Sequence, residues 1–172
     1  MLKKFCLFLL ILSLAFPRYL PAEDDSASLS DDAFLEMVQE KSFRFFQHEH
    51  NPHNGLVRDS TSNHENGFDN APASIAATGF ALTAYGVAVE HGWMSRASAY
   101  TLTVRTLEFL LRQAAQHHGF FYHFLDIETG QRVSQSELSP IDTALCLAGA
   151  LFAAEYFDDA KIRDLVRELY ER

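Results

Sequence analysis

The sequence predicts an all-α fold in which helices form two concentric layers, as in an incomplete (α/α) toroid. Along the chain, amphipathic helical segments alternate with segments that are apolar on nearly every side, in five segments altogether. An amphipathic helix covers a core with one face, whereas a helix that is apolar all round needs neighbours on every side. A simple bundle would show one apolar stripe on each helix, so the alternation favours outer helices that cover inner ones.

The N-terminus has the layout of a secretory signal peptide over residues 1–22. Lys3 and Lys4 precede an apolar run of about a dozen residues, and Ala22 is followed by acidic residues. The run is shorter than the roughly 20 residues of a membrane-spanning helix. We expect cleavage after Ala22, export to the periplasm or the medium, and no stable membrane anchor afterwards. An uncleaved anchor is the alternative, because Leu20 makes the cleavage site imperfect. An acidic, serine-rich linker is expected over residues 23–30.

The folded part is expected over residues 31–172 and begins with three helices. The first spans about 31–50 and has apolar residues near one stripe, and a long polar loop follows it to about residue 74. The second, 75–90, is apolar on nearly all sides, and Gly92 is placed for a C-terminal cap. The third, about 95–117, is amphipathic. These segments give the first three steps of the alternation.

One short β-hairpin and two helices complete the expected order. Aromatic residues that favour strands precede a turn signal within residues 120–133, which predicts the hairpin. Ser139 and Pro140 then start a helix that runs to Phe157 and is again apolar nearly all round. The last helix, 161–172, is amphipathic. Five helices cannot close a ring, so we expect either a truncated barrel or a missing layer supplied from elsewhere.

Charge and composition exclude several classes of partner. The formal net charge is −9, and loss of Lys3, Lys4 and Arg18 with the signal peptide would make it −12. An acidic chain is unsuited to nucleic acid, whose binding rests on basic contacts to phosphate. The sequence has no glycine-rich phosphate loop, esterase elbow or zinc-protease motif, and the histidines at 48, 50 and 53 have no fixed geometry. We expect neither a metal nor an organic cofactor.

Glu137 and Asp142 are the candidate catalytic residues. They flank the start of a buried helix, and a glycosidase needs one carboxyl group to protonate the leaving oxygen and a second to activate water or attack the sugar. A structural alternative stays open. Ser139 and Asp142 have capping-box spacing, in which the Asp142 carboxylate would bind the backbone N–H of Ser139. Glu137 would then be a solvated surface residue.

Two further groups are candidates for binding substrate. Arg58 and Asp59 lie in the long polar loop, where they form either a ligand-orienting pair or an ordinary surface ion pair. His123 and Asp126 lie in an aromatic-rich segment that suits sugar rings, whose apolar faces stack while hydroxyls seek polar partners. The alternative for the aromatic residues is a place in the core.

Several motifs occur in an order that resembles a known family. They are Gly-Leu-Val-Arg-Asp at 55–59, Gly-Phe-Phe-Tyr-His-Phe-Leu-Asp at 119–126 and Glu-Leu-Ser-Pro-Ile-Asp-Thr-Ala at 137–144, after a phenylalanine-rich helix at 34–46. Together they resemble the N-terminal part of the bacterial glucoamylase-like (α/α)6-barrel glycoside hydrolases, which include endo-β-1,2-glucanases. Such domains are longer than this chain, so the later helices of the barrel would be missing.

The resemblance implies hydrolysis of glucan or oligoglucoside bonds, by a domain that is truncated here and need not be active alone. It implies that Arg58 and Asp59 shape the glycone-side pocket, with His123 and Asp126 nearby. Glu137 and Asp142 would be the acidic residues at the catalytic rim, with Asp142 as a catalytic or water-positioning group. A non-catalytic, exported helical-hairpin binding or scaffold protein is the alternative.

The incomplete ring also predicts that the mature chain alone is either poorly folded or self-associating. Inner apolar residues would be partly open to water, and large apolar patches are uncommon on soluble monomers. The residues expected to be open are Phe80, Leu82, Leu147 and Leu151.

Overall fold

The computed structural model describes residues 29–62 and 71–172. The predicted signal peptide, residues 1–22, lies outside the described residues, as do residues 23–28 of the linker and 63–70 of the polar loop. The chain divides into two units, Met1–Leu35 and Glu36–Arg172. In the first, residues 29–35 are described and include the start of a helix. The second unit holds the packed helices and the candidate site.

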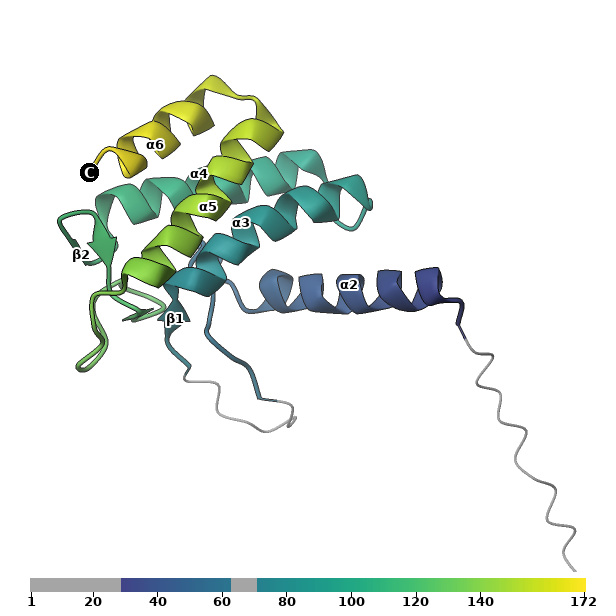
Figure 1. Ribbon diagram of the computed structural model, residues 1–172, viewed down its shortest axis with the longest axis horizontal. Coiled ribbons are helices and arrows are strands. Elements are labelled where there is room, and N and C mark those ends of the chain that lie inside the picture. Colours follow the sequence, from purple (N-terminus) through teal and green to yellow (C-terminus); the bar gives the residue numbers. More distant parts are fainter. Residues whose placement is uncertain (1–28, 63–70) are drawn as a thin grey trace, which may run out of the picture. The chain divides into compact units, whose positions relative to one another are not determined.

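The fold is all-α, as the sequence predicts (Figure 1). The described residues form five helices: α2 (Asp31–His48), α3 (Ile75–Glu90), α4 (Arg96–Arg112), α5 (Pro140–Phe157) and α6 (Ala160–Tyr170). They also form four short strands: β1 (Ala73–Ser74), β2 (Gln116–His117), β3 (Phe120–Phe121) and β4 (Phe124–Leu125). The strands make two antiparallel ribbons, in which β1 pairs with β4 and β2 pairs with β3.

Polar side chains fix where four of these helices begin. The hydroxyl groups of Ser74, Ser95 and Ser139 accept a backbone N–H bond in the first turns of α3, α4 and α5. Asp159 accepts two such bonds at the start of α6. Pro140 occupies the first turn of α5, where its missing N–H costs no hydrogen bond. The predicted start of α5 is confirmed.

The inner helices α3 and α5 lie side by side and touch through their backbones (Figure 1). A Cβ atom placed on Gly149 would lie 1.9 Å from the carbonyl oxygen of Gly79. A Cβ atom on Gly79 would lie 2.5 Å from the Cα atom of Cys146. Cys146 is buried at this contact, and burial raises the pKa of its thiol to about 12. Glycine at both positions therefore sets the distance between the two helices.

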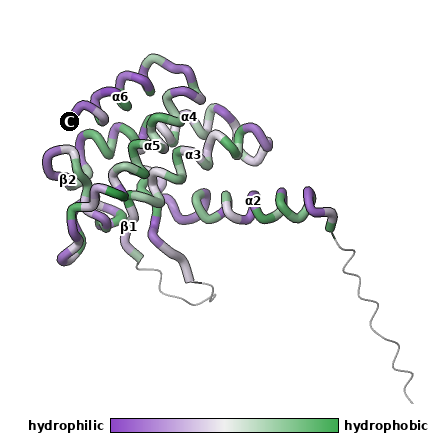
Figure 2. Tube along the Cα trace, viewed as in Figure 1, coloured by the Kyte–Doolittle hydropathy of each residue, from purple (hydrophilic) through white to green (hydrophobic). Residues whose placement is uncertain are grey.

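The outer helices α4 and α6 pack on this pair and on each other. Helix α6 buries one apolar face and exposes charged residues, whereas α3 and α5 are hydrophobic along most of their length (Figure 2). By length and composition α5 could cross a membrane, but Cys146, Ala150 and Ala153 are fully buried in the protein core. The predicted division into inner and outer helices is confirmed.

One face of the inner pair is uncovered in the described structure. Phe80 on α3 is 51% exposed and Leu151 on α5 is 45% exposed, as expected, and Leu147 is half-buried. The expectation was wrong for Leu82, which is completely buried. It packs in the core cluster, whereas Phe80 lies on a different side of the same helix.

Residues 113–133 differ most from the sequence expectation. Helix α4 ends at Arg112, and the regular hairpin is formed by β2 and β3, around His118 and Gly119. Both turn residues have positive φ angles, as a tight two-residue hairpin turn requires. The predicted hairpin segment 120–133 folds back at the predicted turn but holds a single bridge, from Leu125 to Arg132, while β4 also pairs with the distant β1.

Candidate active site

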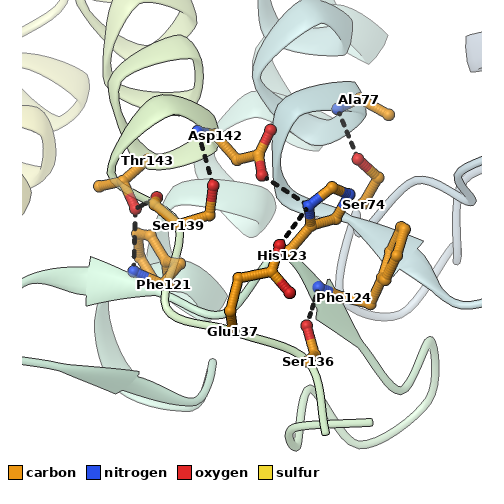
Figure 3. Close-up of polar contacts among 10 residues, drawn as sticks. All are labelled: Ser74, Ala77, Phe121, His123, Phe124, Ser136, Glu137, Ser139, Asp142 and Thr143. Carbon is orange, nitrogen blue, oxygen red and sulfur yellow. Dashed lines mark hydrogen bonds and ion pairs between the residues drawn. The ribbon is translucent and has the colours of Figure 1, made fainter. Parts of the chain in front are cut away.

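The N-terminal ends of α3 and α5 meet beside His123 (Figure 3). The Nδ1 atom of His123 lies 3.0 Å from Oδ2 of Asp142 and 3.3 Å from Oε1 of Glu137. The Asp142 side chain is 11% exposed, whereas the Glu137 side chain is 70% exposed. The structure thus brings both predicted catalytic carboxylates to one imidazole nitrogen.

Backbone hydrogen bonds hold His123 between the two helices. Its N–H donates to the carbonyl oxygen of Glu137 at 2.9 Å, and its own carbonyl oxygen accepts from the N–H of Ile75 at 3.3 Å. The neighbouring Phe124 N–H donates to the Ser136 hydroxyl at 2.8 Å (Figure 3). The His123 backbone is therefore tied both to the start of α3 and to the segment that leads into α5.

The strand β3 is tied to α5 by a second set of bonds. The Thr143 hydroxyl accepts the Phe121 N–H at 2.9 Å and donates to the Ser139 carbonyl oxygen at 2.8 Å. The Ser139 N–H donates to the carbonyl oxygen of Phe121 at 2.9 Å. The cap of α5 is thereby built from Ser139, Thr143 and the β3 backbone.

These bonds decide against the reciprocal capping box. The Ser139 hydroxyl does accept the Asp142 N–H, at 3.3 Å, which is one half of that motif. In the other half of the motif the Ser139 N–H would donate to the Asp142 carboxylate. Here the Ser139 N–H donates to the carbonyl oxygen of Phe121 instead. The Asp142 carboxylate is buried near the helix N-terminus and is not used to cap the helix.

The contact between Asp142 and His123 is close but poorly aligned. The Asp142 Oδ2 atom is buried and accepts no hydrogen bond of normal geometry from the part of the chain that the structure describes. It nevertheless lies 3.0 Å from His123 Nδ1, within ion-pair distance. The distance thus fits a hydrogen bond but the angle does not. Catalytic contacts are often misaligned before substrate binds. A buried carboxylate oxygen without a well-formed bond is unusual in a purely structural role.

Arg58 lines two polar cavities of about 300 and 410 Å³, and neither cavity is lined by Glu137 or Asp142. Its Nε atom is 3.6 Å from Glu49, and one terminal nitrogen donates to the carbonyl oxygen of Ala71 at 3.0 Å. Arg58 also bridges Ala73 in β1, the strand that pairs with β4 directly after His123. The two groups of predicted site residues therefore flank the same small ribbon.

The other two predicted binding residues differ from each other. Asp59 is exposed, and its backbone N–H donates to the carbonyl oxygen of Pro72. Asp126 lines the larger cavity with Arg58, but its Oδ1 atom accepts bonds from the backbone of Thr129 and Glu128 and from the Thr129 hydroxyl. These bonds, chiefly those of Thr129, hold the pKa of the Asp126 carboxyl below its usual range. Asp126 thus stabilises its own turn as well as facing the cavity.

Two buried asparagines that the sequence did not single out are Asn51, which lines the smaller cavity, and Asn54, which follows the lining residue His53. Buried Asn51 donates to the Ile127 carbonyl oxygen at 3.0 Å and to Glu128 at 2.9 Å, and buried Asn54 donates to the same carbonyl oxygen at 2.9 Å. An Asn-Pro-His-Asn-Gly sequence indicates a turn, but nothing local shows that its amides hold a distant segment. The cavity is lined by His48, Glu49, His50, Asn51, Pro52, His53, Arg58, Ile127 and Glu128. Within residues 29–62 and 71–172, no group of three or more His, Cys, Asp or Glu residues could hold a metal ion.

Comparison with known proteins places these observations in context. No protein-family model matches the chain. It is 27% identical over 135 residues to an exo β-1,2-glucooligosaccharide sophorohydrolase from Parabacteroides distasonis. That match includes 76% of this chain and 18% of the relative. The chain therefore spans about a fifth of the length of this curated relative.

Solved structures agree with the sequence match. The endo-β-1,2-glucanase from Chitinophaga pinensis superposes with a TM-score of 0.73 at 23% identity, over 84% of this chain and 36% of that protein. A glucoamylase-like protein from Bacteroides uniformis gives 0.70 at 25% identity, over 83% of this chain and 35% of that one. Sequence and fold together confirm that the chain is similar to part of the bacterial glucoamylase-like (α/α)6-barrel glycoside hydrolases, the family that includes endo-β-1,2-glucanases.

Proposed function

We propose that this chain supplies acidic residues to the active site of a glucan-hydrolysing enzyme, with Asp142 as a catalytic or water-positioning carboxylate. The observation that carries the proposal is the Asp142 carboxylate itself. It is buried at the start of an inner helix. The Ser139 N–H that it would accept as a simple cap donates to the carbonyl oxygen of Phe121. Glu137 lies beside it at the more exposed rim.

The spacing of the two carboxylates limits how they could cooperate. Both carboxylates contact the same nitrogen, at 3.0 and 3.3 Å. The distance between their two contacting oxygens therefore cannot exceed the sum of these two distances. That is below the roughly 6.5–9.5 Å that separates the acid and base of inverting glycosidases. The two contacting oxygens are thus nearer the spacing of a retaining pair, roughly 5–5.5 Å, than the middle of the inverting range. Either they act as a closer pair, or Asp142 works with a carboxylate from another segment.

The substrate class follows from the relatives and from the polar cavities. We assign β-1,2-linked glucan or its oligosaccharides, because the curated relative from Parabacteroides distasonis is named for hydrolysis of β-1,2-glucooligosaccharides. Arg58, Asp59 and Asp126 would bind sugar hydroxyls, and the cavity of about 410 Å³ that Arg58 and Asp126 share supports this role. The basic and apolar N-terminus supports export to the periplasm or the medium.

An assay of the chain with three polysaccharides tests the proposal. Purified protein is incubated with β-1,2-, β-1,3- and α-1,4-glucan, and released oligosaccharides are separated by anion-exchange chromatography. We expect products from β-1,2-glucan. The Asp142→Asn variant should lose at least about a hundredfold in rate, because general acid–base catalysis contributes roughly that much. Its melting temperature should stay close to that of the unaltered chain.

Asp159→Asn is the matched control. It also removes a carboxylate at a helix N-terminus, on α6, and asparagine caps helices about as well as aspartate. It should leave the rate unchanged. Normal turnover in Asp142→Asn would reduce Asp142 to a helix residue. Oligosaccharide binding without any hydrolysis would instead favour the non-catalytic binding protein, and absence of both would overturn the carbohydrate assignment.

A further inference from the structure

His123 has an arrangement that suits a different role from direct contact with the sugar. Its Nδ1 atom lies near two carboxylate oxygens, from Asp142 and Glu137, at 3.0 and 3.3 Å, in contacts that are close but not aligned as hydrogen bonds. Ionised carboxylates accept hydrogen bonds and donate none. A nitrogen lone pair this close to two negative oxygens would be repelled by both, so the proton of the imidazole belongs on Nδ1.

We propose that His123 is a positioning residue that carries its proton on Nδ1 and holds the Asp142 carboxylate in its working orientation. This inference rests on the function proposed above. Of the two acceptors, Asp142 is the one that needs the donor, because its side chain is 11% exposed and that of Glu137 is 70% exposed. Water can solvate Glu137, whereas a buried carboxylate oxygen left without a donor is costly.

The surroundings of His123 allow it to perform this role. Its backbone is bonded to Glu137 on one side and to Ile75 on the other, so the residue is fixed relative to both helix starts. The centre of its ring lies 3.9 Å from that of Phe124, which restricts rotation of the imidazole. A small movement of the Asp142 side chain would suffice to align the contact, since the two atoms are already 3.0 Å apart.

The position of the imidazole proton can be measured without any activity. Long-range ¹H–¹⁵N correlation spectra of the full chain at neutral pH distinguish a proton on Nδ1 from one on Nε2, and the His123→Asn variant assigns the signal. We expect Nδ1 to be protonated. Asp142→Asn should shift the proton towards Nε2, because the new amide can donate to Nδ1, whereas Glu137→Gln should leave it on Nδ1. A neutral ring protonated on Nε2 in the unaltered chain would overturn the proposal, as would sensitivity to Glu137→Gln alone.

Kinetics on β-1,2-glucan separate positioning from substrate binding. His123→Asn keeps an N–H donor near the Nδ1 position and should retain kcat within about tenfold, whereas His123→Leu should lose about a hundredfold, the usual scale for such groups. KM should change little in both, since the interaction is made to Asp142 and not to the sugar. A rise in KM at constant kcat would overturn positioning in favour of direct binding. If the unaltered chain hydrolyses no glucan, the proposed function fails, and the tautomer still decides the role of His123.

Discussion

The inner and outer helix pairs are built on different physical principles. Helices α3 and α5 touch backbone to backbone at Gly79 and Gly149, and composition leaves them almost no polar face. Helices α4 and α6 are amphipathic and are linked by an ion pair between Glu108 and Lys161. The inner pair therefore depends on close backbone packing, which requires glycine at the two contact positions. The outer pair depends on ordinary burial of apolar faces, which tolerates more variation in sequence.

The largest effect is expected where the inner backbones touch. Gly149→Ala would place a methyl group 1.9 Å from the Gly79 carbonyl oxygen, so α3 and α5 must separate. We expect a loss of about 3–5 kcal/mol in the free energy of unfolding, at the upper end for a single substitution. Urea unfolding followed by circular dichroism measures it, and failure to fold at all would agree with the same cause.

Gly92→Ala is the matched control for this substitution. A Cβ atom on Gly92 meets nothing within 4 Å, but the residue has a φ of +73°, so the substitution reports backbone strain alone. That strain should cost about 1–2 kcal/mol. If Gly149→Ala costs no more than Gly92→Ala, the close approach does not determine the stability of the inner pair.

The same comparison shows what the sequence could and could not predict. Apolar composition identified α3 and α5 as inner helices, and Ser139 with Pro140 located the start of α5, because both signals are local. Composition alone could not say that Leu82 is buried while Phe80 is exposed, since both residues are apolar and lie only two positions apart.

The candidate site was predictable in its residues but not in its geometry. Glu137 and Asp142 were recognisable from their place beside an inner helix. Their shared contact with His123 depends on β1 pairing with β4, about fifty residues later in the chain. The backbone bond from Ser139 to Phe121, which frees the Asp142 carboxylate from capping, is likewise a tertiary contact. Patterns along one segment carry no information about such pairings.

The uncovered face of the inner pair leads to the second prediction, that two copies associate through it. Leu151 is 45% exposed on α5, next in sequence to the exposed Phe152, and Phe80 is 51% exposed on the neighbouring helix α3. Sedimentation analysis of residues 23–172 should show a dimer whose dissociation constant rises at least about tenfold in Leu151→Glu, or ~1.4 kcal/mol. Tyr170→Glu changes a hydrophobic residue that is more exposed, at 63%, on the outer helix α6, and it should leave association unchanged. A monomer at all concentrations would contradict the prediction.

The smallest effect is expected at the ion pair that links the outer helices. Lys161 Nζ lies 2.9 Å from Glu108 Oε1, and this bond from Lys161 lowers the pKa of Glu108. Both side chains are more than a third exposed, so Lys161→Met should cost only about 0.5 kcal/mol at pH 7 and low salt, as for other solvent-screened pairs. Because the pKa is lower in the folded state, the contribution is present above the ordinary glutamate pKa and is lost as the pH falls through the folded value.

Unfolding measured at pH 7 and pH 2, with and without 1 M salt, tests this, since acid and salt should each remove the difference between Lys161→Met and the unaltered chain. A loss well above about 1 kcal/mol, or one that persists at pH 2, would mean that the Lys161 stem stabilises the α4–α6 contact by packing and not by charge.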